Sequence, residues 1–321
     1  MKKHFKKLLL MALMAVMAVG LIACGTDKSD NESTKEEKTS VTITSLDASK
    51  NEIELEVPYN PKRIAILDLA SLDIIDELGV GDRVVGMAST SIDYLEKYSN
   101  DASIKNLGTI KEADLEAVME CEPDIIFIGG RLSKSYDALS EIAPVVYLAT
   151  DTNEGLVNSV SKNAKTIASI FGMEDKVDSL MSDFGARIDT IKKISSGKTA
   201  LVGMTTSGSF NLLGNDGRCS LIGVEAGFNN LTAAGSTSTH GNETSFETVV
   251  KQNPDYIFVM DRDSAISTAG AKNAKEIVES ELVKTTDAYK NNHIIYLEHS
   301  NVWYTAEGGI QALDIMLTDL E

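Results

Sequence analysis

The order of apolar and polar residues divides the chain into strands and helices that alternate. Residues 41–46 and 52–57 alternate apolar and polar side chains around a short polar segment, which predicts a β-hairpin. Short apolar runs such as 64–67 and 124–128 predict strands that are buried on both faces, and residues 154–171 have the apolar spacing of a helix. Strands that alternate with helices predict parallel sheets with right-handed crossovers.

The same reasoning extends along the rest of the chain. Further strands are expected at 83–87, 145–148, 199–206 and 293–297, and further helices at 69–78, 133–142, 219–226 and 305–320.

One stretch of this pattern occurs twice, 131 positions apart. Residues 114–131 (DLEAVMECEPDIIFIGGR) and 245–262 (SFETVVKQNPDYIFVMDR) are identical at seven of eighteen positions without a gap. Each copy predicts a short helix carrying a Glu, a Pro-Asp break, a buried strand and a terminal Arg. The repeat therefore predicts two lobes of the same design.

The long segment 174–195 has apolar residues at helical spacing and is expected to be one helix that joins the lobes. The predicted fold is α/β, with two Rossmann-like α/β sandwich lobes and a ligand cleft between them. The N-terminal lobe would span 41–173 and the C-terminal lobe 196–321.

The N-terminus has the pattern of an export signal. Four lysines precede the apolar run 8–22, which is shorter than the roughly 20 residues that a membrane-spanning helix needs, so a transmembrane anchor is the weaker alternative. The run ends in Leu-Ile-Ala-Cys, which resembles a bacterial lipobox. We expect residues 1–23 to be a signal peptide, Cys24 to be lipidated, and residues 24–40 to be a flexible tether.

Charge and cysteine content limit the possible partners. The formal net charge is −18, and loss of the four signal lysines makes it more negative, so nucleic acid is not an expected partner. Cys121 and Cys219 are predicted to be core thiols, although an extracytoplasmic setting would permit a disulfide. Against the acidic background the chain has only six arginines.

Catalytic motifs are absent from the sequence. There is no G-x-S-x-G, H-E-x-x-H or C-x-x-C pattern, and Gly197-Lys198-Thr199 lacks the earlier glycine of a phosphate-binding loop because Lys192 stands there. We therefore expect a binding protein and not an enzyme.

Three arginines are candidate ligand-binding residues. In open α/β sheets ligands bind beyond the carboxyl ends of the strands, where Arg131 and Arg262 are expected, and Arg218 lies in a glycine-flanked loop. Each could instead pair with a local carboxylate such as Asp261 or Asp263. Together they favour an anion site, because guanidinium groups hold delocalised oxygen anions well.

Other candidates have equally plausible structural alternatives. His240 lies in a polar loop and could simply be solvated, while Trp303 and Tyr304 precede the last predicted helix and Trp303 could belong to the core. Glu116 and Glu247 occupy the same place in the two repeat copies. They could lie on solvated helix faces, or they could be matched docking charges for a partner that touches both lobes.

These motifs resemble one protein family over nearly the whole chain from Lys38 to Glu321. The lipobox, the repeated Glu…Pro-Asp pattern and the segments GGR, GNDGR, STHGNE, MDRD and NVWYTAEGG are similar to those of substrate-binding lipoproteins of iron-siderophore ABC importers. Within that family the pattern looks like the catecholate group that includes petrobactin-binding proteins.

The resemblance implies a role for each candidate residue. Arg131, Arg218 and Arg262 would hold the catecholate oxygens in a cleft that also includes Trp303. His240 and Tyr304 would complete the coordination of ferric iron when the siderophore leaves positions open.

It also implies partners and a location. Glu116 and Glu247 would dock on arginines of an ABC permease dimer, which works with its ATPase. The protein would stand on the extracytoplasmic face of the cell membrane, anchored by lipid on Cys24, and would carry no resident cofactor besides its ferric siderophore ligand.

Two rivals stay open. The same fold could bind haem or a corrinoid, with His240 or Tyr304 as an axial ligand, or the chain could be a nitrogenase-like α/β enzyme, which the missing catalytic motifs disfavour. A binder of free metal is less expected, because the sequence has no evident cluster of His and carboxylates.

Overall fold

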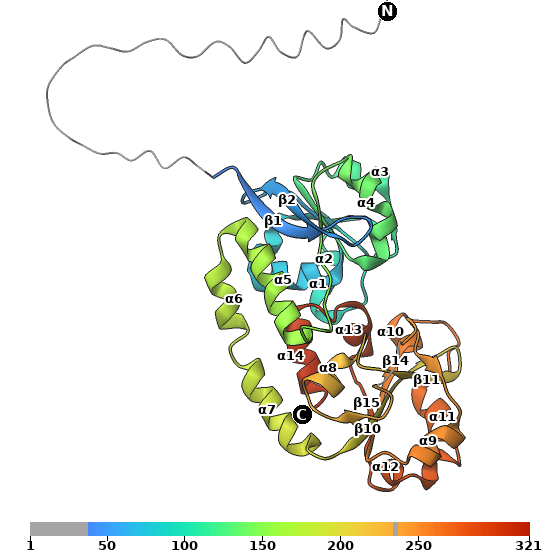
Figure 1. Cartoon of the computed structure of the whole chain (residues 1–321). Coiled ribbons are helices and arrows are strands. Elements are labelled where there is room, and N and C mark those ends of the chain that lie inside the picture. The colour runs from blue at the N-terminus through green and yellow to red at the C-terminus, as the bar shows by residue number, and fades with distance from the viewer. Residues whose placement is uncertain (1–37, 234–236) are drawn as a thin grey trace, which may run out of the picture. The chain divides into compact units, whose positions relative to one another are not determined.

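The computed structural model describes residues 38–233 and 237–321, and residues 38–321 form one compact unit. The expected signal peptide, Cys24 and most of the tether lie outside the described residues. Within the unit, two separate sheets form from consecutive halves of the chain (Figure 1). The α/β fold with two lobes that the hydrophobic pattern predicts is confirmed, while the lobe limits given above remain predictions.

The first lobe begins with the expected hairpin, β1 (Ser40–Leu46) and β2 (Glu52–Pro58), which pair antiparallel. Its main sheet is parallel throughout, in the order β5-β4-β3-β8-β9. The strands are β3 (Ile64–Leu67), β4 (Val84–Met87), β5 (Lys105–Asn106), β8 (Ile125–Ile128) and β9 (Val145–Tyr147), with a small separate pair, β6 (Gly108–Thr109) and β7 (Glu112–Ala113).

Two helices of this lobe begin at an aspartate that caps them. Asp68 ends β3 and accepts the backbone N–H of Ser71, which starts α1 (Leu69–Glu77), and Asp114 caps α3 (Leu115–Glu120) in the same way. The remaining helical segments are η1 (Gly81–Arg83), η2 (Asp93–Leu95), α2 (Glu96–Ser99), η3 (Gly130–Ser135) and α4 (Tyr136–Ser140). The helix expected at 133–142 is therefore shorter and follows a 3₁₀ turn.

The second lobe has a mixed sheet in the order β13-β11-β10-β14-β15, with β12 also pairing with β10. Strand β11 is antiparallel to β10, whereas β14 and β15 continue in parallel. The strands are β10 (Thr199–Thr206), β11 (Ser209–Leu213), β12 (Asn229–Asn230), β13 (Asn242–Glu243), β14 (Tyr256–Asp261) and β15 (Ile294–Tyr296). The helical segments are α8 (Ser220–Val224), α9 (Phe246–Gln252), α10 (Arg262–Ala265), α11 (Ala274–Val278), η4 (Val283–Thr285) and α12 (Asp287–Lys290).

The two repeat copies occupy equivalent places in the two sheets. Strand β8 lies between β3 and β9, and β14 lies between β10 and β15. The repeated Asp makes equivalent hydrogen bonds in the two copies. Asp124 accepts the N–H groups of Lys62 and Arg63, just before β3, and Asp255 accepts the N–H of Thr199, the first residue of β10. The repeat in the sequence is thus a repeat in the structure.

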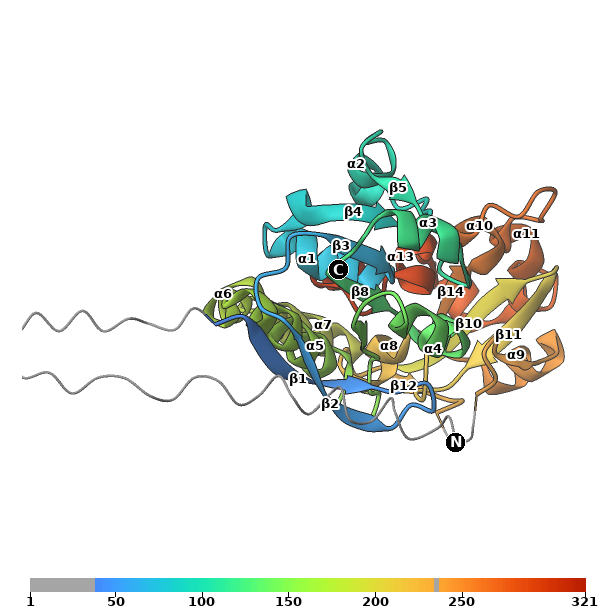
Figure 2. The same cartoon turned by 90° about the horizontal axis from the view of Figure 1, so that it is seen from above.

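The connection between the lobes is helical but is not one helix. It consists of α5 (Leu156–Phe171), α6 (Glu174–Leu180) and α7 (Phe184–Ser195), which both views place together along one side of the lobes (Figures 1 and 2). Gly172 ends α5 in a left-handed conformation with φ 67°. The single helix expected over 174–195 is wrong in detail, because a turn at 181–183, rich in residues that compete for backbone hydrogen bonds, interrupts it.

The closing helix expected at 305–320 is likewise two helices, α13 (Ser300–Thr305) and α14 (Ile310–Thr318), separated by a segment that contains Gly308 and Gly309. The buried carboxylate of Asp73, on α1 of the first lobe, accepts the N–H groups of Gln311 and Ala312 at the start of α14. A Cβ atom on Gly309 would lie 2.3 Å from Asp73 Cγ, so this approach requires glycine. The contact joins the C-terminal helix to the first lobe.

The two cysteines of the described residues are buried and free, as expected for core thiols. Within the same residues no helix combines the length and apolar character that crossing a membrane requires.

Candidate functional site

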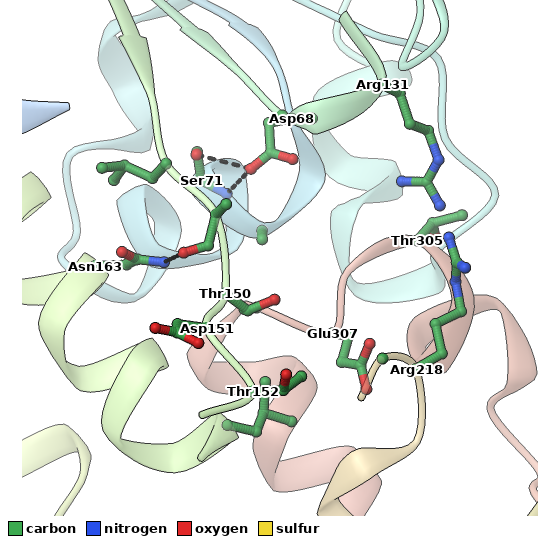
Figure 3. Close-up of a pocket in the computed structure, with 18 of the residues that line it drawn as sticks. Asp68, Ser71, Arg131, Thr150, Asp151, Thr152, Asn163, Arg218, Thr305 and Glu307 are labelled. Carbon is green, nitrogen blue, oxygen red and sulfur yellow. Dashed lines mark hydrogen bonds between the residues drawn. The ribbon is translucent and has the colours of Figure 1, made fainter. Parts of the chain in front are cut away.

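A cavity of about 380 Å³ lies between the lobes, at the carboxyl ends of their strands. Its walls come from the end of β3 with Asp68, the turn after β8 with Arg131, the turn before α8 with Arg218, and the α13–α14 segment with Tyr304 and Glu307. Figure 3 shows the guanidinium groups of Arg131 and Arg218 pointing toward each other from opposite walls. Segments far apart in the sequence thus form one cleft.

Tyr304 is the centre of the arginine cluster, which we define as Arg131, Arg218 and Arg262. The guanidinium carbons of the three arginines lie 5.4, 4.5 and 5.8 Å, respectively, from the centre of the Tyr304 ring. The three arginines that the sequence predicts as site residues are therefore brought together around one aromatic ring, which stabilises their charges by cation–π contact.

Arg131 lies in η3, directly after β8, where the strand end directs it to the cleft. Its Nη2 donates to the backbone carbonyl of Tyr304 over 2.9 Å, which links the two lobes. Removal from bulk water lowers the pKa of Arg131, and the positive charge of Arg218 lowers it further. Arg131 is thus held beside a like charge, an arrangement that an anion between them would stabilise.

Arg218 precedes α8 and lies closest to the Tyr304 ring. Its Nη1 donates to the carbonyl oxygen of Thr239 over 3.0 Å, so one nitrogen is occupied by the neighbouring polar loop. A guanidinium group has five N–H donors, so Arg218 can donate to the oxygen atoms of a ligand while it donates to Thr239.

Arg262 begins α10, directly after β14, and its contacts differ from those of Arg131 and Arg218. Its Nη1 forms an ion pair with Asp263 Oδ1 at 2.9 Å, and its Nε donates to the Tyr304 hydroxyl over 3.4 Å. The local pairing considered in the sequence analysis is therefore real for Asp263. Arg262 does not line the cavity and acts on it through Tyr304.

The three arginines change the acidity of Tyr304. Burial acts to raise the pKa of the buried phenol, but the hydrogen bond from Arg262 and the charges of the cluster outweigh it, and the pKa of Tyr304 is lowered. A phenolate oxygen is a hard anionic ligand of the type that ferric iron prefers. The geometry therefore favours the form of Tyr304 that could coordinate iron.

His240 lies on the exposed loop that precedes β13, and its carbonyl oxygen accepts from Asn211 Nδ2. Partial burial and the charges of Arg262 and Arg218 lower the pKa of His240. Burial and the arginine cluster thus both act against the charged form of His240, and the neutral form is the one that binds metals.

Trp303 is not a cleft residue, and its predicted role in ligand binding is wrong. The side chain is 0% exposed, and its Nε1 donates to Asp319 Oδ2 on the C-terminal side of α14. Trp303 and Tyr304 are adjacent on α13, so they point to different sides, and the alternative of a core tryptophan is correct.

The sequence reasoning identified none of the four carboxylates that line the cleft, Asp68, Asp151, Asp216 and Glu307. Asp68 is recognisable only as the cap that follows a buried strand, which is also a common structural role. Glu307 interrupts an otherwise apolar stretch directly before Gly308-Gly309, a signal that could have identified it. Among the described residues, no group of three or more His, Cys, Asp and Glu side chains is arranged to hold a metal ion.

Glu116 and Glu247 are exposed on the first turns of α3 and α9, one helix on each lobe. The structure therefore places them at matched positions on the surface and away from the cavity lining.

Comparison with known proteins shows which protein family the chain belongs to. A sequence profile described as "Periplasmic binding protein" matches residues 64–300, which is more than half of the chain. The chain belongs to the periplasmic binding protein family. Members of this family bind ligands, which agrees with a cleft between two lobes.

Individual members of the periplasmic binding protein family resemble the chain over nearly its full length. The petrobactin-binding protein YclQ of Bacillus subtilis is 36% identical over 98% of both chains. Its crystal structure has a TM-score of 0.80 and covers 88% of this chain and 97% of its own. The catecholate-siderophore binding protein VctP of Vibrio cholerae is 31% identical with a TM-score of 0.78, covering 87% of this chain and 99% of its own.

Proposed function

We propose that the protein binds a ferric siderophore of the catecholate type outside the cytoplasm and delivers it to an ABC permease for iron uptake. The observation that carries this proposal is the arginine cluster around Tyr304 at a cavity between two lobes. A ferric tris-catecholate spreads several negative charges over its oxygen atoms, which guanidinium groups can reach with directed hydrogen bonds. Relatives named for petrobactin and for catecholate siderophores support the choice of ligand.

The binding is non-enzymatic, and no resident cofactor takes part in it. Arg131 and Arg218 contact the catecholate oxygens directly, and Arg262 keeps Tyr304 acidic. Tyr304 and His240 complete the iron coordination when a siderophore supplies fewer than six donor atoms. Both residues are near the positive cluster, so an anionic ferric complex is drawn to the place where they can reach it.

Delivery uses a different surface. Glu116 and Glu247 dock on positive patches of the permease dimer, whose ATPase drives release, and their exposure on both lobes fits a partner that spans the cleft. Lipid on Cys24 holds the protein at the extracytoplasmic face of the membrane. Relatives named as ABC transporter substrate-binding lipoproteins support this location.

A ligand panel tests the proposal. The full chain without its signal peptide is titrated with ferric enterobactin, ferric petrobactin, a ferric hydroxamate and haem, and protein fluorescence is followed. The two catecholate complexes should quench fluorescence at the lowest concentrations. Tight binding of haem with no response to either catecholate would replace this proposal by the haem alternative.

A further inference from the structure

Glu307 is a carboxylate inside a site that otherwise favours anions. It lies between α13 and α14, is half-buried, and lines the same cavity as Arg131 and Arg218. Figure 3 shows its carboxyl group close to the Arg218 side of the cleft. An acidic group at this place would repel the anionic ligand that the arginine cluster attracts.

The position of Glu307 is fixed by the turn that carries Arg218. Glu307 Oε1 accepts the backbone N–H of Cys219 over 2.9 Å. Cys219 has φ 61°, a left-handed conformation that costs free energy for a residue with a Cβ atom and needs support from its surroundings. The carboxyl group therefore cannot simply swing out of the cavity without releasing this turn and, with it, Arg218.

Charged groups surround Glu307 from every neighbouring element. Positive charge comes from Arg218 before α8 and from Arg131 in η3, and negative charge comes from Glu225 at the end of α8. The cavity is also lined by Asp68 of the β3 end, by Asp151 and Asp216 of two exposed loops, and by Tyr304 of α13. Burial raises the pKa of Glu307 to about 7, although the Cys219 N–H and the two arginines act to lower it.

Two ways of relieving the repulsion are available when an anion enters. Glu307 could move, which its bond to Cys219 opposes, or it could take up a proton, after which the carbonyl oxygen still accepts from Cys219. Asp68 is the other candidate acceptor: burial raises its pKa, while the N–H and hydroxyl of Ser71, which both donate to it, act to lower it.

We propose that Glu307 is the proton acceptor of the cleft, so that binding of an anionic ferric siderophore is coupled to proton uptake at its carboxyl group. The coupling rests on the proposed function and adds a pH sensitivity to it. In the ligand-free protein Glu307 titrates near neutral pH, and the ligand shifts its pKa upward. Affinity is therefore greatest at and below pH 7 and falls as the pH rises above that value.

Titration of ferric enterobactin against the full mature chain and its Glu307→Gln variant tests this coupling. Glutamine has nearly the shape of the protonated acid, so the variant should bind like the wild type near pH 6. At pH 8 it should bind up to about tenfold more tightly, because most of the wild-type Glu307 is then ionised. Equal affinity of the two proteins at pH 8, or weaker binding by the variant, would overturn the inference.

Calorimetry of the wild type gives a second measurement that does not depend on a variant. Binding at pH 7.5 in two buffers with different ionisation enthalpies should show net proton uptake of about half a proton or more per ligand. No uptake by the wild type would overturn the coupling even if Glu307→Gln failed to fold.

Three controls identify the group. Glu281→Gln changes an exposed carboxylate that pairs with Lys284 and does not line the cavity, so it should keep the wild-type proton uptake. Proton uptake that disappears in His240→Asn or Asp68→Asn but persists in Glu307→Gln would assign the proton elsewhere and overturn the inference. If neither ferric enterobactin nor ferric petrobactin binds the wild type, the proposed function is wrong, and the proton coupling that rests on it is wrong as well.

Discussion

The strand that leads to Arg131 and the strand that leads to Arg262 are copies of one design, yet the residue after each arginine differs. In the first lobe Leu132 follows and is buried in the core. In the second lobe Asp263 follows, and its two oxygens accept from Arg262 Nη1 and from the backbone N–H of Ser207. One residue therefore decides whether the arginine charge is matched locally.

This difference shows that a repeat can conserve a position while changing its electrostatics. The first lobe contributes an arginine that lines the cavity and has no ion pair among the described contacts, and the second contributes one that acts mainly on Tyr304. We therefore expect the two arginines of the repeat, Arg131 and Arg262, to contribute unequally to ligand affinity.

The largest loss should follow removal of the cavity arginines. Arg131→Ala and Arg218→Ala should each weaken ferric catecholate binding by about 1.5 to 3 kcal/mol, because each removes charged hydrogen bonds to the ligand. Fluorescence titration measures the change. Arg187→Ala is the matched control: Arg187 pairs with Asp314 and Glu321 outside the cavity, so the folded variant should keep its affinity. If both variants kept the wild-type affinity, the cavity between Arg131 and Arg218 would not be the ligand site.

The shared part of the repeat should show equal effects in the two lobes. Asp124→Ala and Asp255→Ala each remove an acceptor from the start of the neighbouring strand and should lower the free energy of unfolding by about 1 to 2 kcal/mol. Urea unfolding followed by circular dichroism measures both. If only one of the two variants lost stability, the two aspartates would be equivalent in position but not in their contribution to the free energy of unfolding.

Changes around Arg262 should be smaller. Arg262→Ala should weaken binding by only about 1 kcal/mol, since Asp263 already balances much of its charge. Asp263→Asn keeps an oxygen for the Ser207 N–H and removes the negative charge, so it should tighten binding a few-fold. Weaker binding by Asp263→Asn would mean that the ion pair is needed to place Arg262.

The docking glutamates should have no effect on affinity at all. Glu116→Ala combined with Glu247→Ala should bind ferric catecholate like the wild type, because both residues lie on the surface away from the cavity. Iron uptake by cells that carry the double variant should fall. Normal uptake would remove the docking role, and reduced binding would show that the variant had disturbed the fold.

Sequence patterns predicted the elements that have strong local signals. The buried strands, the repeat and the placement of Arg131 and Arg262 at strand ends follow from apolar runs that end in polar residues, and these strands and ends are confirmed. Helix ends were less predictable. The turn at 181–183 interrupts a continuous helical pattern, and α14 begins at a contact with Asp73, which is 238 positions away from Gln311.

The chemistry of the cleft was only partly predictable. The sequence identified the arginines and Tyr304, but nothing in it shows that three guanidinium groups share one ring, since these contacts join segments from both lobes. Trp303 was misassigned because adjacent residues of a short helix face different ways, and periodicity over six residues is too short to separate them. Glu307 was overlooked because its role depends on Cys219 and Arg218, which are distant in the sequence.

A ferric siderophore bound in the cleft should lie against the arginine cluster around Tyr304. The most direct test is a crystal of the protein grown with ferric enterobactin, with diffraction recorded at the iron absorption edge. One strong anomalous peak is expected in the cavity bordered by Arg131, Arg218 and Tyr304. An iron peak outside this cavity, or a bound ligand that contacts none of the three arginines, would contradict it.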